Sequence, residues 1–144
     1  MWFYTSRGEI IFQHRAKNKE THPDLLDATV GGHVEVGDTY VQAALKEAEE
    51  ETGITIDPKD LVFFCTTITK SFDEVTGKTN HARRNVYAYR YNWDVADLKE
   101  EQGAGIGFEL WPIDTLPELP ITDAQRFIPK ILNIEIIKRI KALM

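Results

Sequence analysis

The sequence contains a single cysteine, Cys65, among its 144 residues. One thiol excludes an internal disulfide and any zinc site that is built from several cysteines. Cys65 directly follows the apolar run of residues 61–64. We therefore expect it to pack in the core rather than to act as a reactive thiol.

Long apolar runs and an excess of positive charge are also absent. No stretch approaches the roughly 20 residues that a bilayer-spanning helix needs, and no secretory signal is visible. The 23 acidic and 17 basic residues give a formal net charge of −6. A negative chain is repelled by phosphate backbones and by anionic lipids, so we expect neither a nucleic-acid nor a membrane partner. These features favour a cytoplasmic protein.

What the sequence does contain suits one globular domain. Its length, its hydrophobic content of 42% and its charged content of 28% are sufficient for a sizeable core. There are no internal repeats, low-complexity tracts or linker-like segments. We expect a single domain over residues 1–144.

Residues 32–54 read GHVEVGDTYVQAALKEAEEETGI and predict a helix with defined ends. Asp38 and Thr39 offer N-cap oxygens, and Gly53 offers a left-handed stop. A stripe of apolar residues on this helix is expected to pack on a core; it consists of Val41, Ala44, Leu45 and Ala48.

Three carboxylates fall on one face of the predicted helix. Glu47, Glu50 and Glu51 are related by i+3 and i+4 steps, whereas Glu49 points roughly the opposite way. Because like charges at this spacing repel one another, a hard, oxygen-seeking cation over that face is the simplest explanation. The small Ala43 lies on the same side and leaves room for it. An ordinary solvated acidic helix is the alternative, but it explains neither the glycines nor the spacing.

This spacing resembles the Nudix box. That signature is a Gly, five residues, a Glu, seven residues, and then Arg-Glu-aliphatic-x-Glu-Glu-x-Gly-aliphatic. Every gap matches over the 23 residues 32–54. Asp38 stands where the family usually has Glu, and Lys46 stands where it has Arg. A multi-residue match with fixed gaps is much more specific than a lone glycine-rich triplet.

The resemblance implies an α/β fold, an α/β/α sandwich with a mixed β-sheet between helices. It also implies a Mg²⁺-dependent hydrolase, with Mn²⁺ as a substitute ion. The expected substrate is a small-molecule diphosphate, namely a nucleoside diphosphate linked to another moiety. The metal would acidify water and screen the phosphoryl oxygens at the diphosphate linkage.

The same resemblance assigns roles to individual residues. Glu47 would be a metal ligand or the general base, and Lys46 would hold it in place, although less firmly than the planar fork of arginine. A loop after the strand at residues 85–91 supplies a further glutamate in many family members, so the base is alternatively Glu100 or Glu101, of which we select Glu101. The implied metal ligands are the carbonyl of Gly32 and the carboxylates of Glu47, Glu50 and Glu51.

Cations elsewhere in the chain are candidates for substrate binding. Arg15 and Lys19 precede the box, and their spacing resembles that of the phosphate-gripping Arg and Lys of isopentenyl diphosphate isomerases, which share the Nudix fold. Arg84, with its neighbours His81 and Arg83, could reach a substrate phosphate or could equally face solvent.

Isomerase activity itself is not expected. The isomerases carry a catalytic cysteine just before the Gly-His pair of their box, and Gly31 occupies that position here. His33 aligns with a metal-binding histidine of the isomerases, but a lone histidine is more often structural. An isomerase-like enzyme and a non-catalytic nucleotide-binding module, suggested by Asp38 and Lys46, are the alternatives to hydrolysis.

The remaining pattern predicts further elements. We expect strands at residues 2–5, 9–14, 25–30, 61–69, 85–91 and 108–111, a strand and turn over 54–58, a hairpin loop at 71–79 and a mobile glycine-rich lid at 103–107. The pattern is helical over 122–144, where Pro129 would start or kink the helix. Many Nudix domains carry a segment before the first hairpin, which here is either absent or supplied by another subunit. The edge that this leaves and the apolar last helix suggest a homodimer.

Overall fold

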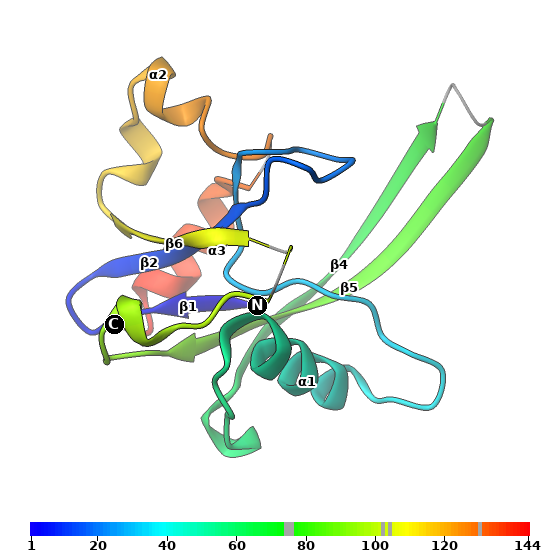
Figure 1. Cartoon of the computed structure of the whole chain (residues 1–144), viewed down its shortest axis with the longest axis horizontal. Helices are drawn as coiled ribbons and strands as arrows, with labels where there is room; N and C mark the ends of the chain where they lie inside the picture. The colour runs from blue at the N-terminus through cyan, green and yellow to red at the C-terminus, as the bar shows by residue number, and fades with distance from the viewer. Residues whose placement is uncertain (74–76, 102, 104, 130) are drawn as a thin grey trace.

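The computed structural model of the chain describes residues 1–73, 77–101, 103, 105–129 and 131–144 (Figure 1). Within these residues, short 3₁₀ turns at Pro58–Asp60, Val95–Asp97 and Leu116–Glu118 connect longer elements. The strands and helices are β1 (Trp2–Tyr4), β2 (Glu9–Arg15), β3 (Leu26–Asp27), α1 (Tyr40–Thr52), β4 (Val62–Asp73), β5 (Lys78–Arg90), β6 (Gly105–Pro112), α2 (Ile121–Ala124) and α3 (Ile134–Lys141).

The strands form one mixed sheet. β1 pairs antiparallel with β2 on one side and parallel with β5 on the other. β6 pairs antiparallel with β2, β3 pairs with the end of β2, and β4 pairs antiparallel with β5. β1 is therefore an internal strand, so the exposed N-terminal edge that suggested a dimer does not exist.

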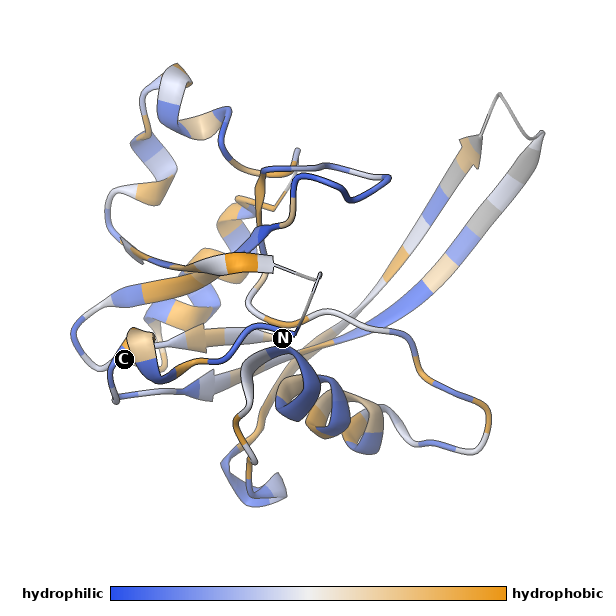
Figure 2. Cartoon of the chain, viewed as in Figure 1, coloured by the Kyte–Doolittle hydropathy of each residue, from blue (hydrophilic) through white to orange (hydrophobic). Residues whose placement is uncertain are grey.

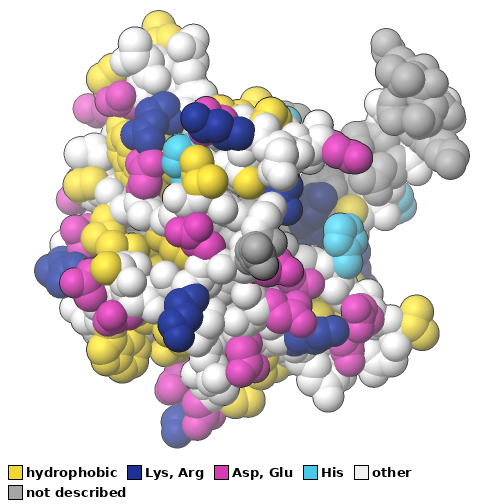
Figure 3. All heavy atoms as spheres, in the orientation of Figure 1, with side chains coloured by type: hydrophobic (Ala, Val, Ile, Leu, Met, Phe, Trp, Pro, Cys, Tyr) yellow, Lys and Arg dark blue, Asp and Glu magenta, His cyan; other side chains and the backbone are white. Residues whose placement is uncertain are grey.

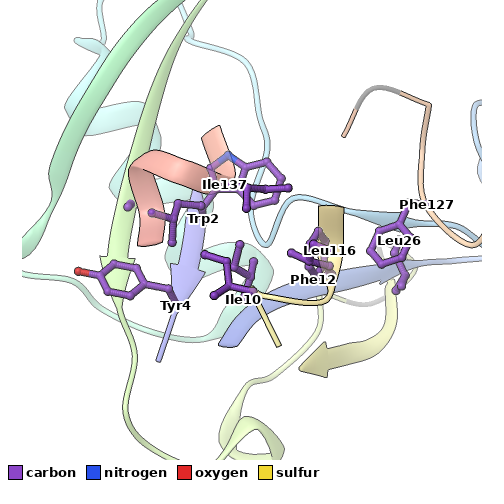
Figure 4. Close-up of a cluster of buried hydrophobic side chains, with 11 residues drawn as sticks. Trp2, Tyr4, Ile10, Phe12, Leu26, Leu116, Phe127 and Ile137 are labelled. Carbon is purple, nitrogen blue, oxygen red and sulfur yellow. The ribbon is translucent and has the colours of Figure 1, made fainter. Parts of the chain in front are cut away.

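Two helices cover opposite faces of this sheet. Successive side chains of a strand point to opposite faces of the sheet, so β1 and β2 each supply side chains to both faces. One set, which includes Trp2 and Phe12, packs in a cluster with Ile137 and Ile140 of α3 (Figure 4). The other set, which includes Phe3, packs with Ala48 of α1 and with other residues. The predicted α/β/α sandwich with a mixed sheet is confirmed. The apolar residues of α3, which suggested a dimer, pack against the sheet of the same chain.

The ends of α1 are as the sequence predicts. The Thr39 side chain accepts the N–H of Gln42 in a capping box, and Gly53 ends the helix in the left-handed region with φ 70°. Figure 2 shows that α1 is strongly hydrophilic along one side. The predicted apolar stripe is only partly correct. Ala48 is fully buried, but Val41 is 38% exposed and the small Ala43 is buried in its place. Ala43 therefore packs against the body and does not leave space above the carboxylates.

Three predicted elements are only partly correct. The helical segment expected over residues 122–144 is divided into α2 and α3 with Pro129 between them, and Asn133 caps α3 by accepting the N–H groups of Glu135 and Ile136. Residues 54–57 form no strand, but the expected turn follows as a 3₁₀ turn that begins at Pro58 and is capped by Asp57. The hairpin loop expected at 71–79 is shorter, since β4 and β5 extend to Asp73 and Lys78, and residues 74–76 lie outside the described residues.

A buried hydroxyl ties the segment before the acidic helix to the sheet. Thr29 is fully buried, and its Oγ1 accepts the N–H of Phe3 at 2.8 Å and donates to the carbonyl of Ile11 at 2.5 Å. Both bonds hold the chain that leads to Gly31 and Gly32.

We expect Thr29→Val to lower the free energy of unfolding by about 2–4 kcal/mol, because two buried backbone groups lose their partner. Thr29→Ser keeps the hydroxyl and should cost only about 1 kcal/mol for the lost methyl group. Urea denaturation monitored by circular dichroism measures both values. Equal losses in the two variants would show that the hydroxyl contributes nothing.

Candidate active site

Two carboxylates of α1, Glu47 and Glu51, are half-buried and lie close enough to other carboxylates for their pKa values to be affected. Burial raises the pKa of the Glu47 carboxyl, and the charges of Glu50 and Glu101 raise it further, while the backbone N–H of His33 acts in the opposite direction. Glu101 comes from the segment before β6, so two parts of the chain that are far apart in sequence contribute to one negative cluster.

Glu51 is the most strongly perturbed member of the cluster. Burial, with a smaller contribution from the charges of Glu47 and Glu101, raises its pKa from 4.5 to about 7. The backbone N–H of Gly31 donates to Glu51 Oε2 at 2.9 Å and partly compensates. A carboxyl group whose pKa is raised by burial and by neighbouring carboxylates is typical of a functional site.

The backbone at Gly32 lies directly against this cluster. A Cβ atom built on Gly32 would be 1.8 Å from Cδ and 1.9 Å from Oε1 of Glu47. No side chain fits at this position while Glu47 keeps its place. By contrast, a Cβ on the adjacent Gly31 would meet no atom within 4 Å.

The oxygen-only donor set fits a hard divalent cation such as Mg²⁺, which prefers carboxylates and retained waters. A bound cation would also neutralise the repulsion that raises the pKa of Glu47 and Glu51. Among the described residues, however, no three His, Cys, Asp or Glu side chains are already arranged as a metal-binding group. The ligand set Gly32, Glu47, Glu50 and Glu51 therefore stays a prediction.

Lys46 has a different partner from the one that the resemblance implies. Its Nζ lies 3.0 Å from Oε2 of Glu35, which is on the loop before α1. This ion pair raises the pKa of Lys46. Lys46 thus anchors the loop that carries Glu35, and its role in holding Glu47 stays a prediction.

The guanidinium of Arg15 uses three of its five N–H donors within the chain. It donates to the carbonyls of His22 and Thr21 and to Oδ2 of Asp27, at 3.2, 2.9 and 3.2 Å. Arg15 therefore organises the loop over residues 16–25, and its role in gripping a phosphate stays a prediction. Lys19 lies on the same loop, where its backbone N–H donates to the carbonyl of Ala16.

The alternation of β5 separates the two candidate arginines. Arg84 is on the same side of the strand as Val86 and Ala88, which pack with the α3 cluster, and its Nη1 donates to Thr69 Oγ1 at 2.8 Å. Arg83 shares the opposite side with Tyr89, which packs with the α1 cluster. Of the two, Arg83 lies on the face that carries the acidic helix, and the substrate role selected for Arg84 stays a prediction.

The expected glycine-rich lid is largely a strand. Gly105 and Gly107 belong to β6 and pair with Arg15 and His14 of β2, while residues 102 and 104 lie outside the described residues. The Oε1 atom of Glu100 would be 3.6 Å from a Cβ on Gly107, so Glu100 is turned toward β6. Glu101 is the member of the pair whose charge acts on both Glu47 and Glu51.

Gln13, a polar residue of β2, was not identified as a candidate from the sequence. Gln13 of β2 is 4% exposed, and its Nε2 has no hydrogen-bond partner among the described residues. It pairs across β2–β3 with Asp27, the partner of Arg15. A single glutamine in a strand carries no pattern that marks it as functional, and only the buried donor without a partner distinguishes it.

The position of the isomerase cysteine is occupied by Gly31, which is exposed, donates its N–H to Glu51 and carries no thiol. Cys65 lies on β4 and is half-buried, so the expected core position is only partly realised. Within the described residues, no helix combines the length and the apolar character that crossing a bilayer requires.

Known proteins share both this sequence pattern and this fold. A Nudix hydrolase from Yersinia pestis is 51% identical over 47 residues, which are 33% of this chain and 26% of that protein. A Nudix hydrolase from Deinococcus radiodurans is 40% identical over 52 residues, which are 36% of this chain and 30% of that protein. The matched stretch thus spans less than a third of the length of these curated relatives.

Two solved structures illustrate the shared fold. The NUDIX domain of NrtR from Shewanella oneidensis, crystallised with ADP ribose, has a TM-score of 0.68 at 13% identity, over 98% of this chain and 84% of that chain. An Ap4A hydrolase from C. elegans has a TM-score of 0.60 at 16% identity, over 99% of this chain and 92% of that chain. The family model of the NUDIX domain matches residues 1–130, which is most of the sequence. This chain belongs to the Nudix family.

Proposed function

We propose that the protein is a Mg²⁺-dependent hydrolase that cleaves the diphosphate linkage of a nucleoside diphosphate joined to another moiety. The observation that carries the proposal is the contact between the Gly32 backbone and the Glu47 carboxylate, which lies close enough to Glu50 and Glu101 for their charges to raise its pKa. An ordinary acidic surface helix would leave its carboxylates in water and would not place one where a Cβ on the neighbouring backbone would collide with it.

Each residue of the cluster has a part in this reaction. Mg²⁺, when bound, would lower the pKa of a water molecule and screen the charge of the phosphoryl oxygens. Glu50 and Glu51 would hold the ion, together with the carbonyl of Gly32. Glu47 or Glu101 would accept the proton of the attacking water, because the raised pKa of Glu47 brings it closer to neutral pH, where a general base is most effective.

The substrate class is supported by the chemistry of the similar proteins. One was crystallised with ADP ribose and another is named an Ap4A hydrolase, and both compounds contain adenosine attached to a chain of phosphates. The buried amide donor of Gln13 and the cations of the loop over residues 16–25 are suitable groups for such a polyanion.

A panel of nucleoside diphosphate derivatives, including ADP ribose and Ap4A, tests the proposal. We expect at least one compound to be hydrolysed with Mg²⁺ or Mn²⁺ and none after chelation with EDTA. Hydrolysis in ¹⁸O-labelled water, followed by mass spectrometry, would show which phosphorus the water attacks. Tight nucleotide binding without turnover would favour the non-catalytic module instead, and isomer formation from isopentenyl diphosphate would favour the isomerase alternative.

A further inference from the structure

The hairpin formed by β4 and β5 projects beyond the rest of the sheet (Figure 1). Only Ala88, Tyr89 and Arg90 of β5 pair with β1, so the preceding part of β5 has β4 as its only strand neighbour in the described residues. We call residues 66–73 and 78–85 the arm. At about 3.3 Å per residue, eight residues in each strand give an arm roughly 26 Å long.

Large apolar side chains on this arm are exposed. Ile68 is 66% exposed and Phe72 is 64% exposed. Residues that face each other in an antiparallel pair lie on the same side, and Ile68 opposes Arg83 while Lys70 opposes His81. One face of the arm therefore alternates exposed apolar groups with cationic or titratable groups. This is the same face that carries α1 nearer the body.

A free two-stranded ribbon is a poor structure in water. Isolated hairpins are marginally stable, and independent stability requires a third strand or a packed face. Exposed edges with unpaired N–H and C=O groups invite pairing with another chain. The arm has two such edges and no cover within the described residues, so a partner that buries it would stabilise it.

The charge of the arm is opposite to that of the remaining chain. Residues 66–85, which are the arm together with residues 74–77 between its strands, contain four Lys and Arg residues against two Asp and Glu residues. The remainder of the chain contains 13 basic against 21 acidic residues, a formal charge of −8. Figure 3 shows acidic side chains gathered beneath the projecting hairpin, over the part of the molecule where α1 lies.

We propose that the arm docks on the acidic body of a second copy of this chain, and that a reciprocal pair of arms forms a two-fold dimer. The charge difference selects this occupant, because the same chain supplies a positive arm and a negative body. Nucleic acid or an anionic membrane would be attracted to the arm but repelled by the body. Two arms pairing with each other would place their cations together, which is unfavourable.

Apolar and ionic contacts contribute differently to such a dimer. Ile68 and Phe72, which are exposed in the single chain, would become buried in the interface. Lys70 would contribute a long-range electrostatic attraction, which dissolved salt weakens. In a two-fold dimer every substitution occurs twice, so a modest loss at one arm is doubled in the dimer. The dimer should therefore be sensitive to small changes on the arm and should weaken at high ionic strength.

Sedimentation velocity of the full chain tests this proposal. The protomer mass is 16.5 kDa, and we expect a species of twice that mass at low salt, with the monomer favoured as salt is raised. Ile68→Thr with Phe72→Thr keeps residues that suit strands but removes the anchors. Lys70→Glu reverses one charge on the arm. Each of these variants should raise the dimer dissociation constant at least tenfold.

Matched controls change similar residues away from the arm. Ile121→Thr removes an exposed isoleucine on α2, and Lys138→Glu reverses an exposed lysine on α3; both should dimerise like the unmodified protein. Circular dichroism confirms that each variant is folded. A monomer at all concentrations up to about 100 μM would overturn the proposal. So would a dimer that survives the arm substitutions, or one that the control substitutions also break.

Discussion

Replacing Glu51 with glutamine should lower Mg²⁺-dependent turnover at least about a hundredfold, and Glu50→Gln should have a similar effect. Each change keeps the size of the side chain and removes a charge that a divalent ion requires. The backbone contact at Glu51 survives, because a glutamine Oε1 can still accept the N–H of Gly31. Activity measured at saturating and at limiting Mg²⁺ separates weaker ion binding from slower chemistry.

The same change at Glu51 should stabilise the metal-free protein near pH 8. In the folded state its pKa is raised to about 7 from 4.5, so the folded protein holds the proton more tightly than the unfolded chain does. Stability therefore falls as pH rises through the interval between these two values, and the penalty is complete above it. Glutamine carries no charge and avoids the penalty, so the melting temperature of the Mg²⁺-free variant should exceed that of the unmodified protein at pH 8 but not at pH 4.

Glu49 supplies the control on the same helix. It is exposed, points away from the cluster, and accepts the Thr55 hydroxyl at 3.2 Å. Glu49→Gln should leave turnover within about twofold, since surface changes of this kind cost little. Full activity in Glu50→Gln and Glu51→Gln would refute the assignment of the site, whatever the substrate panel shows.

The acidic helix was predictable because its signals are local. N-caps and C-terminal glycines act within a few residues, and Thr39 and Gly53 cap the helix as the sequence predicts. The sheet core was predictable for the same reason, since β1 and β2 are short apolar runs that are buried on both faces.

The arm and the last helix were not predictable in the same way. In the outer parts of β4 and β5, exposed side chains are described on both faces, such as Ile68 and Arg83 on one and Thr69 and Arg84 on the other. A sequence of this kind looks like a loop to an argument from hydrophobic alternation. In the last segment, the apolar spacing of Ile131 and Leu132 suits a helix, but Asn133 caps a later start and leaves both residues outside it. The pairing of β4 with β5 sets the structure of the arm, and the Asn133 cap sets the start of α3.

The candidate site depends on contacts between distant segments. No short sequence pattern indicates that the charge of Glu101 raises the pKa of Glu47. Nor does one indicate that Arg15 donates hydrogen bonds to carbonyls of the loop that follows it. Lys46 illustrates the same limit, because Glu35 stands 11 residues earlier and takes the ion pair that the resemblance assigns to Glu47. The residue types in the sequence indicate which chemistry the candidate site can perform. Which residues contact one another can be seen only in the folded structure.

Gly32→Ala should reduce turnover at least about a hundredfold while barely changing stability. The added Cβ would lie 1.8 Å from Cδ of Glu47, so the two groups cannot keep their positions. The Glu47 carboxylate is the end of a flexible side chain and can move away, which spares the fold. Its displacement would misplace a ligand or base by about 1 Å or more, and a misplacement of that size is enough to cost about a hundredfold in rate.

The neighbouring glycine separates this explanation from a general sensitivity of the loop. Gly31→Ala adds the same methyl group one residue earlier, where nothing lies within 4 Å and no positive φ is required. We expect Gly31→Ala to keep turnover within about twofold and to leave the melting temperature unchanged, as is usual for surface substitutions without strain. If both alanine variants lost activity equally, the loss would reflect loop conformation. If only Gly32→Ala lost it, the close approach of backbone and carboxylate is itself required for catalysis.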